Sequence, residues 1–294
     1  MPDAFFDWGL PRERTGIAAS ENLVQRRAAV AAAPVDPSIA FERTDIAGVR
    51  CLVFRAPRAD AGTMLYFHGG GYRMGAPEPW AAYADSLRAA TGCTIVVPDY
   101  RLAPEHPFPA ALHDAAGIYA KLSAYAPVII AGDSAGAGLA AGLALAVHRA
   151  KAPAPQALVL ISPMLDLRAE DETYDSRAET DRFFSRTNML DCAQMYLQGH
   201  AADDPLASPL HADAAAFPRT LVLIGGKEVL LGEAIRFADK LARGGKTVTL
   251  HVAENSGHVW PMLEARTDAA RDALQAMDAF LKAARNASDG AAGQ

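Results

Sequence analysis

The clearest candidate for covalent chemistry is Ser134, which lies in the stretch "VIIAGDSAGAG" between an apolar run and a helix-like run. A serine at a sharp strand-to-helix turn has a strained backbone, which Gly132 and Gly136 tolerate because they carry no side chain. Such a turn lifts Ser134 to the tip of a strand and leaves the Ala135 N–H at a helix N-terminus, free to donate to a developing oxyanion. The alternative is a tight glycine turn with a helix-capping serine.

The same stretch also overlaps a dinucleotide fingerprint, since "GAGLAA" matches Gly-x-Gly-x-x-Ala. The acidic residue that this fingerprint needs about 20 positions later is missing, because that region reads "QALVLIS". The match also starts inside the helix pattern. We therefore expect no nucleotide cofactor.

A second signal is the glycine run His68-Gly69-Gly70-Gly71, which directly follows an apolar run. Glycines leave backbone N–H groups uncovered, as an oxyanion hole requires. No Gly-Lys-Ser/Thr follows, so a phosphate cradle is disfavoured. We expect His68 to orient this loop by hydrogen bonds and not to titrate in the reaction.

A third segment, "PDYRLAPEHPFPAALHD", places three prolines before a helix-like run and predicts a rigid turn with a scaffold role. We assign its acidic residues Glu105 and Asp114 to salt bridges or hydrogen bonds. Asp133, next to the serine, either supports the site from behind or caps the following helix.

The motifs "HGGGY", "DYRLAPEHPFPAAL" and "GDSAG", in this order, resemble the hormone-sensitive-lipase-like branch of the α/β-hydrolase fold, in its bacterial esterase group. The resemblance extends from about Thr63 to Trp260. It implies ester hydrolysis through an acyl-enzyme, without cofactor or metal. It also implies that the backbone N–H groups of Gly70, Gly71 and Ala135 form the oxyanion hole.

The residue that accepts the serine proton must be a histidine, and in this fold the chain order is serine, acid, histidine. Well downstream of the serine lie His211, His251 and His258. His251 is inside a predicted strand and His211 follows an irregular segment. His258 lies in "ENSGHVW", a loop after the last strand, and is the predicted base.

The residue that serves as the acid is harder to identify. No aspartate follows the predicted strand at 220–224, after which the chain continues as "GGKEVLLGEA". Aligned with the family pattern Asp-Pro-Leu-x-Asp-Glu, this segment puts Glu228 on the acid and Glu233 on the closing glutamate. Glutamate can hold an imidazole in one tautomer and stabilise its charged form. Glu233 is the competitor, as a charge at a helix N-terminus. Gly232 replaces an aspartate, so support from that position is in doubt.

Alternating strands and helices must position these residues. Apolar runs rich in Val, Ile and Leu predict buried strands at 49–54, 63–67, 94–98, 128–132, 157–161, 220–224 and 247–252. Helix-like segments lie at 78–91, 108–125, 136–150, 232–244 and 265–285. This alternation predicts an α/β fold with a mainly parallel sheet, whose ligands bind beyond the carboxyl ends of the strands.

Two segments do not fit the alternation, residues 1–42 and 166–211. We interpret both as a partly helical cap over the strand ends, with surface decoration as the alternative. The predicted walls of the substrate pocket are Tyr72, Trp80, Phe183, Phe184 and Trp260. Residues 286–294 are predicted to be a disordered tail.

Composition restricts the partners. The chain has 294 residues, 51% of them hydrophobic, and its net charge of −6 shows no basic stripe. We expect one domain and neither a nucleic acid nor an anionic membrane as partner. No run reaches the roughly 18 apolar residues of a membrane span, and we expect a soluble cytoplasmic protein. The cysteines Cys51, Cys93 and Cys192 are odd in number and suggest no disulfide framework; Cys93 is expected in the core.

The expected substrate is a small ester with a short acyl chain. A lactone, carbamate or amide is the alternative within the same enzyme class. A non-enzymatic binding protein is the alternative outside it, because the family contains a receptor with a disabled site. By analogy with the family, a homodimer through the outer strand and last helix is a further expectation.

Overall fold

The computed structural model describes residues 10–11, 13–57 and 61–292, and one eight-stranded sheet organises them. The strands are β1 (Glu42–Ile46), β2 (Val49–Phe54), β3 (Thr63–Phe67), β4 (Thr94–Pro98), β5 (Val128–Asp133), β6 (Ala157–Ile161), β7 (Thr220–Gly225) and β8 (Val248–Ala253). Their spatial order is β1-β2-β4-β3-β5-β6-β7-β8. β2 is antiparallel to β1 and β4, and every pairing from β4 to β8 is parallel.

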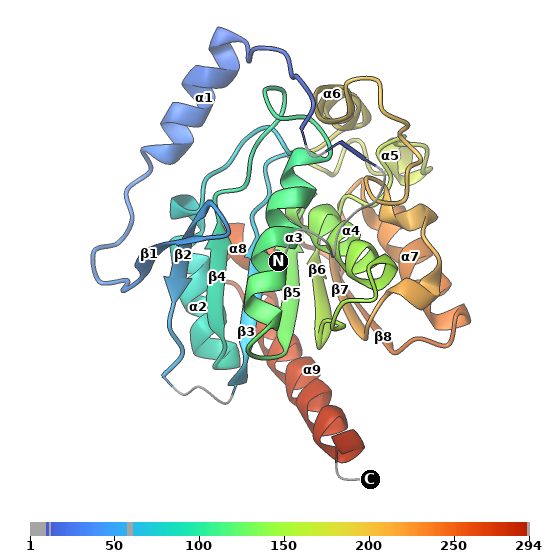
Figure 1. Cartoon of the computed structure of the whole chain (residues 1–294). Coiled ribbons are helices and arrows are strands. Elements are labelled where there is room, and N and C mark those ends of the chain that lie inside the picture. The colour runs from blue at the N-terminus through green and yellow to red at the C-terminus, as the bar shows by residue number, and fades with distance from the viewer. Residues whose placement is uncertain (1–9, 12, 58–60, 293–294) are drawn as a thin grey trace.

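Helices connect and cover the strands (Figure 1). The α-helices are α1 (Glu21–Ala31), α2 (Ala81–Thr91), α3 (Ala110–Ser123), α4 (Ala135–Arg149), α5 (Thr173–Ser176), α6 (Arg186–Leu197), α7 (Leu231–Arg243), α8 (Trp260–Leu263) and α9 (Asp268–Ala292). Short 3-10 helices are η3 (Glu78–Trp80), η4 (Pro209–His211) and η5 (Ala214–Ala216). Figure 1 shows α3 and α4 in front of the sheet and α9 behind it.

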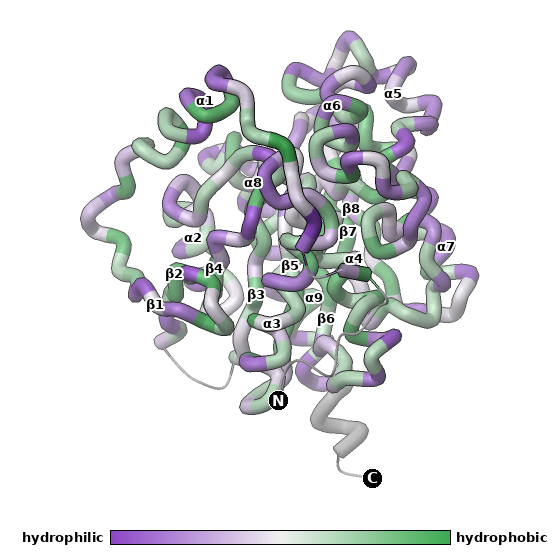
Figure 2. Tube along the Cα trace, turned by 45° about the horizontal axis from the view of Figure 1, so that its top comes forward, coloured by the Kyte–Doolittle hydropathy of each residue, from purple (hydrophilic) through white to green (hydrophobic). Residues whose placement is uncertain are grey.

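Both faces of the sheet are buried at its central strands β3 to β7, which explains why these strands are continuous apolar runs. In β3, Leu65 and Phe67 enter the core with side chains of α3, α4 and α7. Met64 and Tyr66 point to the opposite face and pack with residues of α2, α8 and α9. Figure 2 shows the same contrast, with hydrophobic residues along the central strands and hydrophilic residues on outer segments such as α5.

The seven predicted strands are all present as β2 to β8, and the predicted helices are present with shifted ends. Strand β1 was not predicted, because its residues "ERTDI" are mostly charged or polar and its side chains are largely exposed at the sheet edge. The predicted tail needs correction: α9 continues through Ala292, consistent with the alanines that favour helix in this segment. Residues 293–294 lie outside the described residues.

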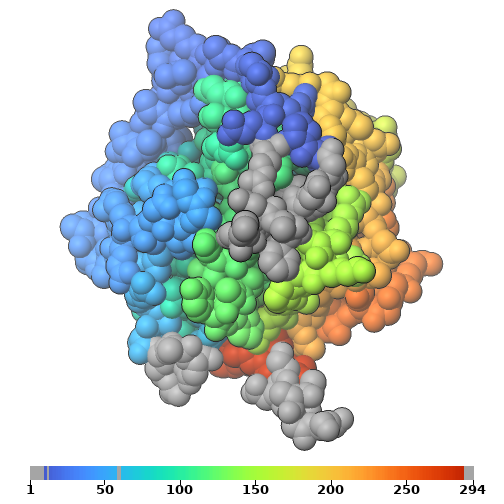
Figure 3. Space-filling model, viewed as in Figure 1, coloured from blue at the N-terminus to red at the C-terminus, as the bar shows by residue number. Residues whose placement is uncertain are grey.

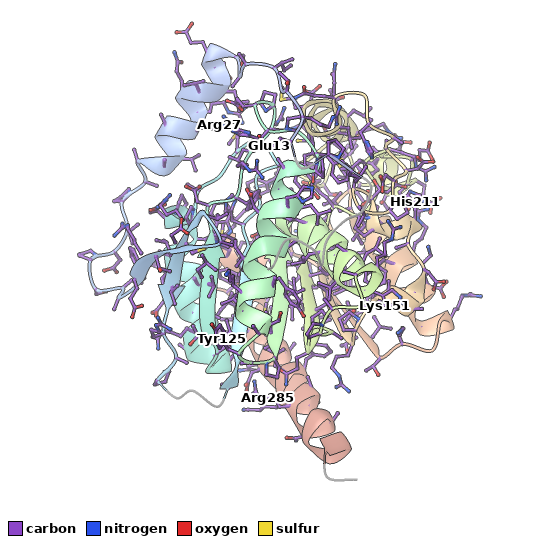
Figure 4. The ribbon with its side chains drawn as sticks, in the orientation of Figure 1. Glu13, Arg27, Tyr125, Lys151, His211 and Arg285 are labelled. Carbon is purple, nitrogen blue, oxygen red and sulfur yellow. The ribbon has the colours of Figure 1, made fainter. Side chains whose placement is uncertain are left out.

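The two segments predicted as a cap contact each other and the loops after the strands. Of the first, residues 1–9 and 12 lie outside the described residues. Arg14 donates to the carbonyl oxygens of Leu197 and Gln198, at 2.8 and 2.7 Å. Arg27 of α1 donates to the carbonyl of Arg73 and pairs with Glu105. Figure 3 shows the blue segment that precedes α1 against the yellow α6 region, and Figure 4 labels Arg27.

The proline-rich turn has the predicted scaffold contacts. Glu105 forms the ion pair with Arg27 at 2.7 Å, and Asp114 pairs with Arg101 at 2.8 Å. Cys93 is buried in the core as expected, and all three cysteines are free thiols. Within the described part of the chain, no helix is both long and apolar enough to cross a membrane.

Candidate active site

Ser134 lies at the turn between β5 and α4 in the strained conformation that its motif predicts. Its backbone has φ 53° and ψ −122°. A Cβ at Gly136 would overlap the carbonyl oxygen of Phe67, and one at Gly132 would overlap the backbone of Gly136. Ser134 makes no capping hydrogen bond to α4 with its side chain. The turn therefore presents a hydroxyl that is not engaged by the helix.

His258 reaches this hydroxyl from the loop after β8. Its Nε2 is 3.0 Å from Ser134 Oγ, and its Nδ1 is 2.8 Å from Glu228 Oε2. All three side chains are buried. The other two histidines considered above lie elsewhere: His211 pairs with Asp166, and His251 stacks on Trp260.

The electrostatics of this pair favour one tautomer of His258. A carboxylate can only accept, so Nδ1 carries the proton and Nε2 of the neutral ring accepts from Ser134. Burial acts to lower the pKa of His258, but the hydrogen bond and charge of Glu228 outweigh it and hold the pKa above the usual 6.5. Burial raises the pKa of Glu228, and donors from His258, Gly225 and Ser162 oppose that rise.

Glu228 is fixed on the side away from the histidine by two donors. The Gly225 N–H and the Ser162 hydroxyl donate to its Oε1 at 2.6 and 2.8 Å. The same Ser162 hydroxyl accepts the N–H of Val259 at 2.9 Å. Ser162 thus ties the acid to the histidine loop. Ser162 was not among the predicted site residues, although its place at the carboxyl end of β6 is a signal.

The glycine loop after β3 lies against the serine. A Cβ built on Gly69 would be 3.2 Å from Ser134 Cβ. Gly70 and Gly71 have φ of +123° and +63°, and a Cβ on Gly70 would overlap the carbonyl of Met74. In the described chain, no hydrogen bond uses the N–H of Gly70, Gly71 or Ala135. Among the described residues, these three N–H groups are therefore free of a backbone acceptor.

Two buried groups hold this loop from behind. His68 Nδ1 is 2.8 Å from the Gly69 carbonyl, so it donates there, and its ring stacks on Tyr100. Burial lowers the pKa of His68 to about 4, which keeps the ring neutral. Asp133 accepts from Tyr66 Oη at 2.9 Å and from Trp80 Nε1 at 2.8 Å, and burial raises its pKa to about 6.

The five predicted pocket walls separate into two groups. Phe184 stacks on His258 with ring centroids 5.5 Å apart, and the neighbouring Phe183 is 55% exposed. Tyr72 is buried and stacks on Tyr196 of α6. Trp80 and Trp260 need correction, because both pack into the core on the α9 side of the sheet.

Glu233, the competing acid, does not contact His258. Its carboxylate accepts the backbone N–H groups of Leu165 and Asp166 and pairs with Tyr174 Oη at 2.6 Å. Burial raises the pKa of Glu233 to about 8. Glu233 therefore anchors the start of residues 166–211, the second of the two predicted cap segments, which is called the cap segment below.

Aspartates of the cap segment occupy the surroundings of the acid loop. A Cβ on Gly232 would overlap the carboxylate of Asp171, so Asp171 fills the space that an aspartate at 232 would need. Asp181 accepts the N–H of Val229, directly after Glu228. Neither had a sequence signal, because the stretch "DLRAEDETYDSRAETD" resembles an ordinary solvated charged surface.

Across residues 10–11, 13–57 and 61–292, no group of three His, Cys, Asp or Glu side chains has the spacing to hold a metal ion.

Known proteins are similar in sequence to this chain over most of its length. Residues 64–262 match the family model described as the alpha/beta hydrolase fold. An acetyl-hydrolase of Streptomyces hygroscopicus is 35% identical over 234 residues, 78% of each chain. An esterase of Acinetobacter venetianus is 30% identical over 82% of this chain and 81% of its own.

Solved structures of esterases and lipases have the same overall fold as this chain. An esterase/lipase from an uncultured bacterium superposes with a TM-score of 0.84 at 29% identity, covering 92% of this chain and 94% of its own. A hormone-sensitive lipase from a metagenome library gives 0.83 at 30% identity, covering 91% and 93%. The chain belongs to the hormone-sensitive-lipase-like esterases of the α/β-hydrolase fold, and as a member of that family it is a serine carboxylesterase.

Proposed function

We propose that this carboxylesterase cleaves short-chain acyl esters through a Ser134-His258-Glu228 triad and an acyl-enzyme intermediate. The observation that carries the proposal is the unbroken hydrogen-bonded chain from Ser134 Oγ to His258 Nε2 at 3.0 Å and from His258 Nδ1 to Glu228 Oε2 at 2.8 Å. A hydroxyl, a base and an orienting carboxylate in this arrangement are sufficient for nucleophilic acyl transfer.

In the acylation step, Ser134 Oγ attacks the ester carbonyl carbon while His258 Nε2 takes the hydroxyl proton. The carbonyl oxygen becomes an oxyanion, for which the N–H groups of Gly70, Gly71 and Ala135 are the available donors. The carbon–oxygen bond to the alcohol then breaks, and His258 returns the proton to the departing alkoxide. Glu228 stabilises the imidazolium that exists between these two transfers.

Water completes the cycle. His258 takes a proton from water, the hydroxide oxygen attacks the acyl carbon, and the proton goes back to Ser134 Oγ as the acid leaves. Every proton that is taken is returned, so the enzyme needs no cofactor for this step.

The short-chain preference and the cap are the finer parts of the proposal. A relative named acetyl-hydrolase supports a small acyl group. The contacts of Arg14 and Arg27 with the strand-end loops and α6 support a cap made of the N-terminal segment and residues 166–211. The proposed pocket residues are Phe184, which stacks on His258, its chain neighbour Phe183, and Tyr72.

Steady-state hydrolysis of p-nitrophenyl esters from acetate to palmitate tests the proposal, with Ser134→Ala as the control. We expect the highest kcat/KM for the shortest chains and loss of nearly all of it in the variant. A wild type that cleaves none of these esters contradicts the proposal, and lactones are then the next substrates. A preference for palmitate contradicts only the proposed preference for short acyl chains and leaves ester hydrolysis by the triad standing.

A further inference from the structure

Asp181 connects the cap segment to the loop that carries the triad acid. Its side chain is 8% exposed and lies between α5 and α6. Oδ2 accepts the backbone N–H of Val229, the residue after Glu228, at 2.9 Å. Oδ1 accepts the N–H groups of Phe183 and Phe184, both at 2.9 Å. One carboxylate thus satisfies three backbone donors from two segments.

The two ends of this connection lie on either side of His258. On one side, the Val229 contact fixes the backbone next to Glu228, which holds Nδ1 of His258. On the other side, Phe184 stacks on the imidazole with the rings 24° apart in orientation. The negative charge of Asp181 also acts to raise the pKa of His258. A shift of Asp181 would therefore disturb the acid and the aromatic contact of His258 together.

The contact depends on a backbone N–H at position 229. Val229 supplies that N–H, whereas a proline there would have none. Thr173, also in the cap segment, contacts the same loop. Its Oγ1 donates to the Val229 carbonyl at 2.6 Å and accepts the Gly232 N–H at 3.1 Å. Two residues of the cap segment, Asp181 and Thr173, thus hold the acid loop by hydrogen bonds.

We propose that Asp181 is a positioning residue of the esterase reaction, because its carboxylate holds both the Glu228 loop and Phe184 in line with His258. The proposal rests on the proposed triad function. Asp181 touches no reacting atom. Its effect reaches the reaction through the Glu228 loop and through the aromatic contact on the base.

Asp181→Asn is the first variant, because an amide has one acceptor oxygen where the carboxylate has two. One of the two segments then loses its partner, and an NH2 group faces an N–H. With p-nitrophenyl butyrate we expect kcat to fall about tenfold, a loss typical of one hydrogen bond to a charged acceptor. We expect KM to change less than kcat.

The pH profile separates positioning from general stability. The charged groups that face His258 are Glu228 from the acid loop, Asp181 from the cap and Asp133 from β5. Removal of one negative charge makes the imidazolium easier to deprotonate. In the wild type, kcat/KM rises with pH as His258 loses its proton, and this rise is the acid limb of the pH profile. For Asp181→Asn the acid limb should therefore move to lower pH.

Val229→Pro separates the hydrogen bond from the charge, and it also serves if Asp181→Asn does not fold. Proline removes the N–H but leaves the Asp181 carboxylate in place, so kcat should fall while the acid limb stays. Glu179→Gln is the matched control, since Glu179 is an exposed carboxylate in the same segment, and it should match the wild type.

Unchanged kcat and an unmoved acid limb in Asp181→Asn overturn the inference. Equal losses in Asp181→Asn and Glu179→Gln also overturn it, because the effect would then be a property of any charge in the segment. If the wild type itself cleaves no ester, the proposed function fails first. An active wild type with an unaffected Asp181→Asn leaves the proposed function intact and rejects only this role.

Discussion

The two halves of the candidate site are held by different means. Backbone geometry fixes the nucleophile half: Ser134 has a positive φ, and glycines at 132 and 136 let the turn pass against β3. Side-chain hydrogen bonds fix the acid half, through Ser162 on Glu228 and Asp181 on Val229. The first half therefore tolerates almost no change of shape, whereas the second depends on the number and charge of its hydrogen-bond partners.

The largest expected effect is on the acid itself. Glu228→Gln keeps the size of the side chain but removes the charge and the fixed tautomer of His258, so kcat should fall by a factor on the order of 10³ to 10⁴. The acid limb of kcat/KM should also move. The base must be neutral to accept a proton, so activity rises with pH through the pKa of His258.

In the wild type this limb should lie above pH 6.5, because Glu228 outweighs burial and raises the pKa of His258. In Glu228→Gln burial acts without that charge, and the limb should move to lower pH. Stopped-flow or steady-state rates between about pH 5 and 9 measure both quantities. A limb at the same pH in both proteins would show that Glu228 does not act on the titrating base.

The nucleophile half should fail through its backbone. Gly136→Ala places a methyl group on the carbonyl oxygens of Phe67 and His68, and we expect a loss of about 4 kcal/mol or more in the free energy of unfolding. Gly257→Ala, in the histidine loop, is the control because its Cβ would meet nothing within 4 Å. Urea unfolding compares the two. Equal stability of both variants would contradict a backbone constraint at the serine turn.

Ser162→Ala should have an intermediate effect. It removes a donor to the buried Glu228 carboxylate and the acceptor of the Val259 N–H. A hydrogen bond to a charged group is worth about 1.5 to 3 kcal/mol, or a factor of about 10 to 100 in kcat/KM if the loss falls on the transition state. Ester hydrolysis measures it, with Ser86→Ala at a half-buried position of α2 as the control. Wild-type kcat/KM would contradict the support role.

The smallest expected effect tests the space next to the acid loop. Gly232→Ala should destabilise the protein by about 1 to 3 kcal/mol, because the new methyl group displaces Asp171 from its contacts with Thr173 and Arg236. In an Asp171→Ala background the same change should cost less. A double-mutant cycle by chemical unfolding measures the difference, and additive losses would show that the two positions do not share this space.

The contrast between the halves also explains what could be predicted from the sequence. The glycines around Ser134 and in the Gly69–Gly71 run leave contiguous motifs, because a backbone constraint acts on neighbouring residues. The central strands β3 to β7 were predictable because both of their faces are buried. By contrast, the contacts of Glu228 with Ser162 and of Val229 with Asp181 join residues 66 and 48 positions apart, and nothing in either segment marks its partner.

The pocket predictions show the same limit. Trp80 and Trp260 are aromatic residues near the motifs, but hydrogen bonds to Asp133 and to the Ala269 carbonyl hold their indoles in the core. Proximity in sequence to a motif did not determine which face of the sheet they occupy. Phe184 reaches His258 from the cap segment, whose fold depends on contacts that no local pattern records.

The rate and site of labelling by an alkyl fluorophosphonate test the central claim most directly, because this reagent modifies only an activated serine. Peptide mass spectrometry should find a single adduct, on Ser134, in the wild type. Labelling should be slower in Glu228→Gln than in the wild type, and no adduct should form in Ser134→Ala. An adduct on another residue, or equal labelling rates in the wild type and Glu228→Gln, would contradict a triad in which Glu228 and His258 activate Ser134.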